Sequence, residues 1–244
     1  NQNFIKTESS GKDLVYYCGM TEHTWNPDLF KTKGFGGSEE AVINLSKEFA
    51  KMGWNVTVYN NCGTDVMVRD GVTYRPFWEF NVKDKQDAVI LWRSAKAVDH
   101  NINTTKLYID LHDVIPAGEF TEKRLAKIDK IFVKTNAHRG LFPNVPDNKF
   151  AIIPNGQDFG LFNADIKKDQ YLLVNTSSPD RSMDVLPKLF KEVKKQVPQA
   201  RLKWAYGWTI YDQTFAGDSK KMAWKDKINA DMEDAGIENL GRLS

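Results

Sequence analysis

The sequence predicts an α/β fold in which two parallel sheets carry helices on both faces. Short apolar runs of strand length alternate along the chain with longer runs whose apolar residues recur every three or four positions. This is the rhythm of βαβ units, and it restarts after the turn signal Pro154-Asn155-Gly156. We therefore expect two Rossmann-like, doubly wound domains, residues 1–158 and 159–244. The second has too few strands to cover its sheet edge and helix faces, so we expect it to be incomplete.

The clearest helix of the first domain lies between its first two strands. From Ala41 to Met52 apolar residues recur at three- and four-residue steps, and Gly53 ends the pattern. A long loop from Gly19 to about Gly37 precedes this helix. The other expected elements are strands at Leu14–Cys18, Asn55–Tyr59, Val72–Pro76, Ala88–Trp92, Lys106–Leu111, Ile131–Thr135 and Phe150–Ile153, and helices at Thr121–Ile128 and Asn136–Phe142.

The second domain repeats the alternation on a smaller scale. A strand at Tyr171–Asn175 precedes a helix at Asp184–Val197, which Pro198 closes. The next expected elements are an alternating strand from Leu202 to Tyr206, a helix marked by Trp224, Ile228 and Met232, and the start of a strand at Ile237–Leu243.

Composition excludes some classes of partner and site. Of the 244 residues 41% are hydrophobic, and 34 basic residues nearly balance 32 acidic ones, so nucleic acid is not an expected partner. Cys18 and Cys62 lack paired spacing, no apolar run reaches the length of a membrane span, and the polar amino terminus has no signal peptide. We expect a cytoplasmic protein with no metal site. The missing initiator methionine is compatible with a fragment of a longer protein.

A first candidate binding site is the run Gly36-Gly37-Ser38 in front of the first helix. Two glycines allow close approach to a ligand, Ser38 can cap the helix, and exposed amides at a helix start bind phosphate. A plain loop that ends in a capped helix explains the same residues equally well. A dinucleotide fingerprint fails here because Glu39 stands where its third glycine belongs, so a nicotinamide enzyme is a weak alternative.

A second candidate is His112, in the sequence Leu111-His112-Asp113 directly after a strand. Ligands of open α/β sheets sit beyond the carboxyl ends of the strands, where a histidine is well placed for catalysis. The alternative is a histidine whose ring is hydrogen-bonded within the loop and has no role in catalysis. That alternative is our interpretation of the other histidines, which are His23, His100 and His138.

A third candidate is the loop that contains Ser177, Ser178 and Arg181, between a strand and a helix. Hydroxyls, exposed amides and one guanidinium at a helix start form a second site for phosphate, and Arg181 can neutralise a diphosphate. Many βα loops carry serine and arginine, so this loop alone is weak evidence. The occurrence of one such loop in each domain is more informative.

Several motifs together resemble the family 4 retaining glycosyltransferases, which have the GT-B fold, over nearly the whole chain. They are GGSEEAVINLSKEFAKMGWNVTVY, the strand-borne HD, VKTNAHRGLF followed by IIPNGQD, and LLVNTSSPDRSMDVLPKLFKEVKKQVPQARLKWAYGW. The resemblance implies transfer of a sugar from a nucleoside diphosphate sugar to the hydroxyl of a glycan, lipid or small-molecule acceptor. Residues 1–158 would then form the acceptor side and residues 159–244 part of the nucleotide-sugar domain.

The resemblance also implies roles for the candidate residues. Gly36 and Gly37 would lie against the donor diphosphate, and His112 beside the donor sugar. Arg181 falls in the loop that supplies phosphate-binding cations. Cationic side chains and amides can stabilise the departing phosphate without a metal or a cofactor, so we expect a metal-independent enzyme.

The chain also departs from the family pattern. Ser182-Met183 replaces the common Gly-Leu, a second cation is not evident in that loop, and the family's late pair of glutamates is absent. We therefore expect this chain alone to be inactive as a transferase. A sugar-nucleotide epimerase of the same fold and a noncatalytic sugar-nucleotide-binding module remain alternatives. A peripheral membrane contact stays open, and the sequence does not indicate the oligomeric state.

Overall fold

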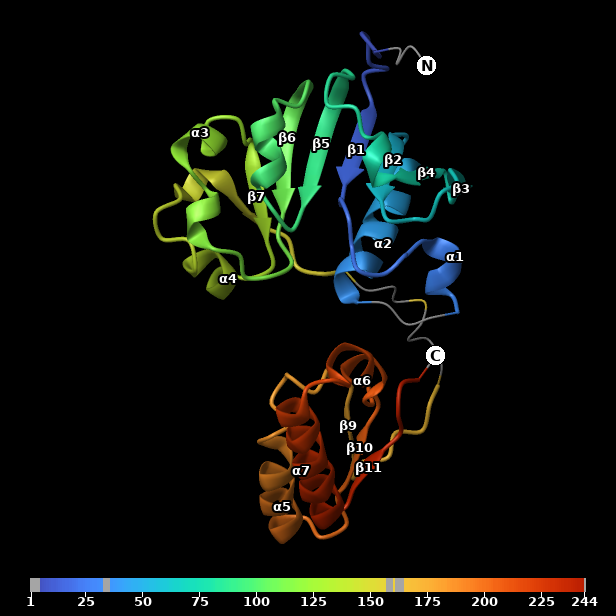
Figure 1. The fold of residues 1–244 in the computed structure, drawn as a ribbon, viewed down its shortest axis with the longest axis vertical. Coiled ribbons are helices and arrows are strands. Elements are labelled where there is room, and N and C mark those ends of the chain that lie inside the picture. Colours follow the sequence, from blue (N-terminus) through green and yellow to red (C-terminus); the bar gives the residue numbers. More distant parts are fainter. Residues whose placement is uncertain (1–4, 33–35, 157–159, 161–164, 244) are drawn as a thin grey trace. The chain divides into compact units, whose positions relative to one another are not determined.

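The computed structural model describes residues 5–32, 36–156, 160 and 165–243, which Figure 1 shows as a ribbon. The chain divides into two compact units, Asn1–Asp158 and Phe159–Ser244. We call them unit 1 and unit 2 and describe each by itself.

Unit 1 contains an eight-stranded sheet in the order β3-β4-β2-β1-β5-β6-β7-β8. Every pairing is parallel except that of β3 with β4. The strands are β1 Asp13–Tyr17, β2 Asn55–Asn60, β3 Met67–Arg69, β4 Val72–Pro76, β5 Gln86–Trp92, β6 Thr104–Asp110, β7 Lys130–Val133 and β8 Phe150–Ile152. Because seven of these strands are parallel, their carboxyl ends meet at one edge of the sheet.

Alternating side chains of the central strand β1 enter two separate cores. Leu14 and Tyr16 point to the face that Val42 of α2 covers, whereas Val15 points to the face that holds Phe142. The helices are α1 Pro27–Phe30, α2 Gly37–Lys51, α3 Glu122–Leu125 and α4 Asn136–Gly140, with single 3-10 turns η1 Phe77–Glu79, η2 Lys96–His100, η3 Ala117–Glu119 and η4 Asp147–Lys149. The predicted doubly wound α/β fold is confirmed for this unit.

Unit 2 contains a three-stranded parallel sheet in the order β11-β10-β9. Its elements are β9 Leu172–Asn175, α5 Leu186–Gln196, β10 Arg201–Trp204, α6 Thr209–Phe215, α7 Ser219–Ala235 and β11 Ile237–Asn239. Leu202 and Trp204 of β10 pack with Phe190 of α5 and Ile228 of α7 on one face of the sheet. Figure 1 shows α5 and α7 side by side along that sheet. On the outer strand β9, Val174 is 58% exposed.

The sequence missed three short elements and misjudged some lengths. It placed α1 in a loop and did not anticipate α6 or β3, because each is too short for a periodic pattern. The strand expected from Leu202 to Tyr206 ends at Trp204. The strand ends because the chain turns at Gly207, whose φ is 70°. Gly207 also lies so close to Gly241 that a Cβ built on Gly207 would be 2.8 Å from the Cα of Gly241.

Ser182 occupies a backbone conformation that favours glycine. Its φ is 67°, in the loop between β9 and α5. The left-handed region costs a residue with a Cβ roughly 1–2 kcal/mol. The carbonyl of Ser182 accepts hydrogen bonds from the amides of Val185 and Leu186 and so holds this turn.

We predict that Ser182→Gly stabilises unit 2 by about 0.5 kcal/mol. The relief of backbone strain exceeds the roughly 0.4–1 kcal/mol that glycine loses through the entropy of the unfolded chain. Chemical denaturation followed through the tryptophans of unit 2 measures the change. Ser182→Ala keeps the Cβ and serves as the control, because it should give no gain. Equal stability of the two variants would show that the strain at Ser182 does not exceed the entropy loss of glycine.

Candidate active site

The glycine run lies at the start of α2, as the sequence predicts. Gly36 is the residue that precedes the helix, and Gly37 is its first residue. A Cβ on Gly37 would meet no atom within 4 Å, so the backbone here is open to a ligand. Residues 33–35, which directly precede this run, lie outside the described part of the chain. The expectation that Ser38 caps the helix is wrong, because Ser38 lies inside it and its hydroxyl donates to Glu39 Oε2 at 2.9 Å.

A carboxylate of the chain itself already lies at this helix start. A Cβ built on Gly36 would be 2.5 Å from Glu39 Oε2, so the acidic side chain folds back over the first turn of α2. Negative charge is favoured at a helix amino terminus, which explains the arrangement without any ligand. Phosphate binding by Gly36, Gly37 and Ser38 stays a prediction.

His112 is buried at the carboxyl edge of the sheet and contacts Asp110. Its side chain is 4% exposed, and Nε2 lies 3.0 Å from Asp110 Oδ2. Asp110 is the last residue of β6 and is 2% exposed. Its other oxygen accepts from Lys134 Nζ at 2.8 Å, and the Tyr16 hydroxyl donates to Oδ2. We call Tyr16, Asp110, His112 and Lys134 the Asp110 cluster.

The Asp110 cluster keeps its carboxyl group ionised. Burial raises the pKa of Asp110, but the hydrogen bonds and charges of His112, Lys134 and Tyr16 outweigh it and lower the pKa to about 2. Burial and the negative charge of Asp110 raise the pKa of Tyr16 well above its usual value. The phenol therefore stays protonated and donates to the carboxylate. Burial likewise raises the pKa of the Cys18 thiol, which disfavours a reactive thiolate.

A second group of contacts holds the loop after His112. Asp113 forms an ion pair with Arg93, whose guanidinium lies 4.8 Å from the centre of the Trp92 ring. The backbone carbonyl of Asp113 is 3.2 Å from His138 Nε2. His138 thus has a structural partner in a loop, in line with its interpretation from sequence.

In unit 2, the predicted phosphate loop is held by side chains from two neighbouring strands. Asn175 at the end of β9 accepts from the Ser177 amide at 2.8 Å, and the Trp204 indole donates to the Ser177 carbonyl at 2.9 Å. Arg181 reaches into solvent, with its side chain 73% exposed and 3.7 Å from Asp180. The guanidinium is therefore open to an anionic ligand.

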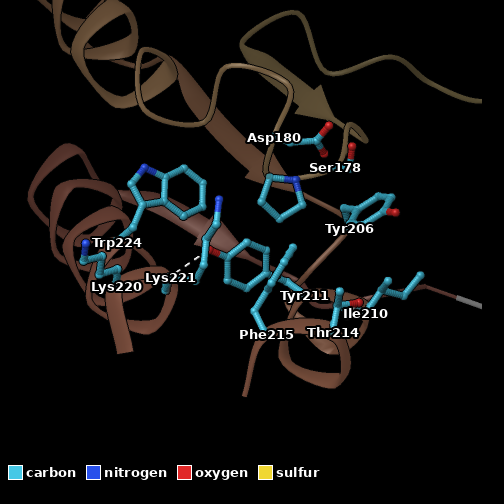
Figure 2. Close-up of a pocket in the computed structure, with 11 residues that line it drawn as sticks. Ser178, Asp180, Tyr206, Ile210, Tyr211, Thr214, Phe215, Lys220, Lys221 and Trp224 are labelled. Carbon is cyan, nitrogen blue, oxygen red and sulfur yellow. Dashed lines mark hydrogen bonds between the residues drawn. The ribbon is translucent and has the colours of Figure 1, made fainter. Parts of the chain in front are cut away.

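A pocket of about 700 Å³ adjoins this loop at the carboxyl ends of β9 and β10. Figure 2 shows the rings of Tyr206, Tyr211 and Phe215 along it, with Ser178 and Asp180 on one side and α7 on the other. The lining residues are Ser178, Pro179, Asp180, Tyr206, Ile210, Tyr211, Thr214, Phe215, Lys220, Lys221 and Trp224. A wall that combines aromatic and aliphatic side chains with polar groups is typical of a small-molecule site.

Two lysines give the pocket a positive side. Lys220 and Lys221 stand in the first turn of α7, where the Asp218 side chain accepts from both of their amides. Lys221 Nζ lies 5.4 Å from the centre of the Phe215 ring. The sequence indicates no second cation for the phosphate loop because Arg181 is the one basic residue of that loop. Lys220 and Lys221 lie far along the chain but line the same pocket as Ser178.

The aromatic residues of the pocket were also missed as functional candidates. Sequence analysis assigned Tyr206 to a strand and Trp224 to a buried helix face. The density of aromatic residues between Trp204 and Trp224 is the signal that indicates more than a core. Trp208 shows why the signal is ambiguous, because it packs edge-on against both Trp204 and Trp224 within the core of unit 2.

Solved structures similar to this chain share its fold at low sequence identity. A glycosyltransferase from Rickettsia africae ESF-5 is 12% identical, with a TM-score of 0.65 over 97% of this chain and 69% of that one. OtsA in its apo form is 11% identical, with a TM-score of 0.55 over 95% and 74%. The catalytic domain of starch synthase IV from Arabidopsis thaliana, bound to ADP and acarbose, is 9% identical, with a TM-score of 0.53 over 96% and 75%. No family model and no curated protein matches the sequence.

These similarities establish a GT-B, Rossmann-like α/β fold with a small second unit. Within the described ranges, no helix is long and apolar enough to cross a membrane. The same part of the chain brings together no group of three or more His, Cys, Asp or Glu side chains suited to a metal ion.

We predict that Asp110→Asn destabilises unit 1 by about 3 kcal/mol at neutral pH, because it leaves the largely buried Lys134 without its counter-ion. It should also flatten the loss of stability in acid. The pKa of Asp110 is depressed in the folded state, so its contribution is complete above the ordinary pKa of 3.8 and disappears as the pH falls through about 2. Urea unfolding at a series of pH values measures both effects. A variant with an unchanged acid slope would show that folding does not lower the pKa of Asp110.

Proposed function

We propose that the chain is a glycosyltransferase that moves a sugar from a nucleoside diphosphate sugar to an acceptor hydroxyl. The observation that carries this proposal is the aromatic pocket of unit 2, which shares Ser178 with the loop predicted to bind phosphate. An apolar space that opens beside a cationic, hydroxyl-bearing loop suits a ligand with a planar base at one end and phosphates at the other.

The pocket has the size and the wall chemistry for a nucleoside. Its volume of about 700 Å³ lies inside the usual range of ligand sites. Tyr206, Phe215 and Trp224 offer ring faces, and stacking of a base on an aromatic side chain contributes roughly 1–3 kcal/mol. Its place beyond the carboxyl ends of parallel strands is where open α/β sheets bind ligands.

Arg181 and the α7 lysines supply the charge that the phosphates need. The exposed guanidinium of Arg181 offers a planar pair of donors that matches phosphate oxygens. Lys220 adds a flexible positive charge at the pocket wall and provides the second cation that the phosphate loop itself lacks. Ser177 and Ser178 add hydroxyl donors.

The reaction requires little from the protein beyond position and charge. The acceptor oxygen bonds to the anomeric carbon while the bond from that carbon to the phosphate oxygen breaks, and the nucleoside diphosphate leaves with both bonding electrons. Arg181 stabilises the charge on the departing phosphate, which accepts the acceptor proton. We propose retention of anomeric configuration, no metal, and His112 as the residue that contacts the donor sugar. A glycan is one acceptor class; the similar starch synthase was solved with ADP and acarbose.

We predict that Arg181→Lys weakens binding of nucleoside diphosphates about tenfold, because it keeps the charge but loses the bidentate fork, and that Arg181→Ala weakens it further. Isothermal titration with ADP, UDP and GDP against the same chain measures the effect. The matched control is Arg201→Lys, since Arg201 is an exposed arginine at the opposite end of β10. Equal affinities for the wild type and Arg181→Ala would contradict the assignment.

We predict that Trp224→Ala abolishes the selective binding of nucleotides over inorganic pyrophosphate, because it removes a stacking wall and leaves the cations in place. Competition between ADP and pyrophosphate tests the split. Trp78→Ala is the control, because Trp78 is a largely exposed tryptophan of unit 1. Unchanged selectivity in Trp224→Ala would show that the nucleotide base does not bind in this pocket.

We predict that, in a form of the protein extended by the residues that complete the donor site, Gly37→Val and His112→Ala each reduce transfer from a panel of nucleotide sugars while the fold persists. A side chain at Gly37 fits the open space but blocks close approach of a ligand, and His112→Ala removes the proposed sugar contact. Release of nucleoside diphosphate with a glycosylated acceptor is the supporting readout, and circular dichroism controls for folding. Formation of an epimerised nucleotide sugar would show that the protein is an epimerase and not a transferase. Binding without turnover would favour a noncatalytic module.

A further inference from the structure

One buried carboxylate in the described part of unit 1, that of Asp110, is a group that the sequence did not single out. Asp110 receives donors from three separate elements, namely Tyr16 of β1, His112 in the loop after β6, and Lys134 directly after β7. Only His112 among them has a proposed role with the ligand. The arrangement therefore raises the question of what Asp110 does to His112.

The hydrogen bond to Asp110 determines which ring nitrogen of His112 carries the proton. An ionised carboxylate only accepts hydrogen bonds, so Nε2, at 3.0 Å from Asp110 Oδ2, must be the protonated nitrogen. In the neutral ring, Nδ1 is then left with a lone pair and is an acceptor. Across the residues that the structure describes, Asp110 is the one side chain that hydrogen-bonds to this ring.

Lys134 balances the charge of Asp110, so the carboxylate does not have to be neutralised by His112. Lys134 Nζ lies 2.8 Å from Asp110 Oδ1 and is 15% exposed. Tyr16 of β1 and Cys18 directly after β1 face the same region as neutral groups. Glu39 approaches Cys18 from α2, and Asp113 forms an ion pair with Arg93. The ring is thus held beside an ion pair with no net charge.

We propose that Asp110 is a positioning residue that fixes His112 in the Nε2–H form and presents Nδ1 as an acceptor, with Lys134 as the counter-ion. The ligand group that meets His112 is then a hydroxyl donor, such as a sugar hydroxyl, and not a phosphate oxygen. This inference rests on the proposed function for the identity of the ligand, but the state of the ring can be tested without turnover.

The direct test is nitrogen-15 NMR of the histidine rings in the full 244-residue chain above neutral pH. His112→Gln assigns the signals of His112 among the four histidines. The wild type should show His112 as the Nε2–H tautomer, and Asp110→Asn should convert it to a mixture of both tautomers. A ring protonated at Nδ1 in the wild type, or an Nε2–H ring that persists unchanged in Asp110→Asn, overturns the proposal.

Two further variants separate positioning from structural support. Asp13→Asn changes an equally buried carboxylate at the opposite end of the same sheet, bonded to Lys6, Ser10 and Asn55, and should leave the His112 signals unchanged. If Asp110→Asn does not fold, the double variant Asp110→Asn/Lys134→Gln serves instead, because it leaves no buried unpaired lysine, and His112 should again show both tautomers. An Nε2–H ring that persists unchanged in the double variant contradicts the role of Asp110.

Kinetics distinguish failure of this inference from failure of the proposed function. If the chain transfers sugar, Asp110→Asn should lower kcat at least tenfold with a smaller change in KM. Asp13→Asn should change kcat and KM much less than Asp110→Asn does. Transfer that is equal in these two variants removes the positioning role and leaves the transferase intact. The expected tautomer change, together with no transfer even by the extended form of the protein, supports the positioning of His112 and refutes the proposed reaction.

Discussion

The parallel direction of the strands is the constraint on which both candidate sites depend. In a parallel sheet every strand ends at the same edge, so the residues that follow β1, β6 and β7 in unit 1 come together although they are far apart in sequence. That edge holds His112 and Lys134 around Asp110. The same rule in unit 2 brings the loop with Ser178 next to Tyr206, which follows the neighbouring strand, and creates one wall of the pocket.

Sequence reasoning succeeded where the signal is local and periodic. The strands of unit 1 and the long helix α2 follow from the spacing of apolar residues, because burial on one face imposes that spacing. It failed for α1, α6 and β3, because elements of so few residues show no periodic pattern. It also failed at Tyr206, which alternates with Trp204 as in a strand but lies in the loop after β10. The turn at Gly207 depends on a close contact with Gly241, a tertiary cause that no local pattern contains.

The candidate residues divide in the same way. His112, Arg181 and the glycine run stand in loops directly after strands or before helices, and position alone identified them. Asp110 was hidden, because a single acid at the end of an apolar strand has no motif, and its importance arises from three partners on different elements. Lys220 was hidden for a related reason, since it lies on α7, far along the chain from the phosphate loop. Tertiary contacts such as the bond from the Tyr211 hydroxyl of α6 to the Lys221 carbonyl hold α6 and α7 together at the pocket.

The position of Glu39 has a consequence for the kind of anion that the start of α2 can accept. Because this carboxylate is tethered beside Gly36, it acts as an internal competitor at high effective concentration. A singly charged anion of similar size gains no more from the helix amides than Glu39 already does, and it must also replace a group that cannot diffuse away. An anion with two or more charges gains more than it displaces. If the start of α2 binds an anion as predicted, the position of Glu39 therefore favours a multiply charged one.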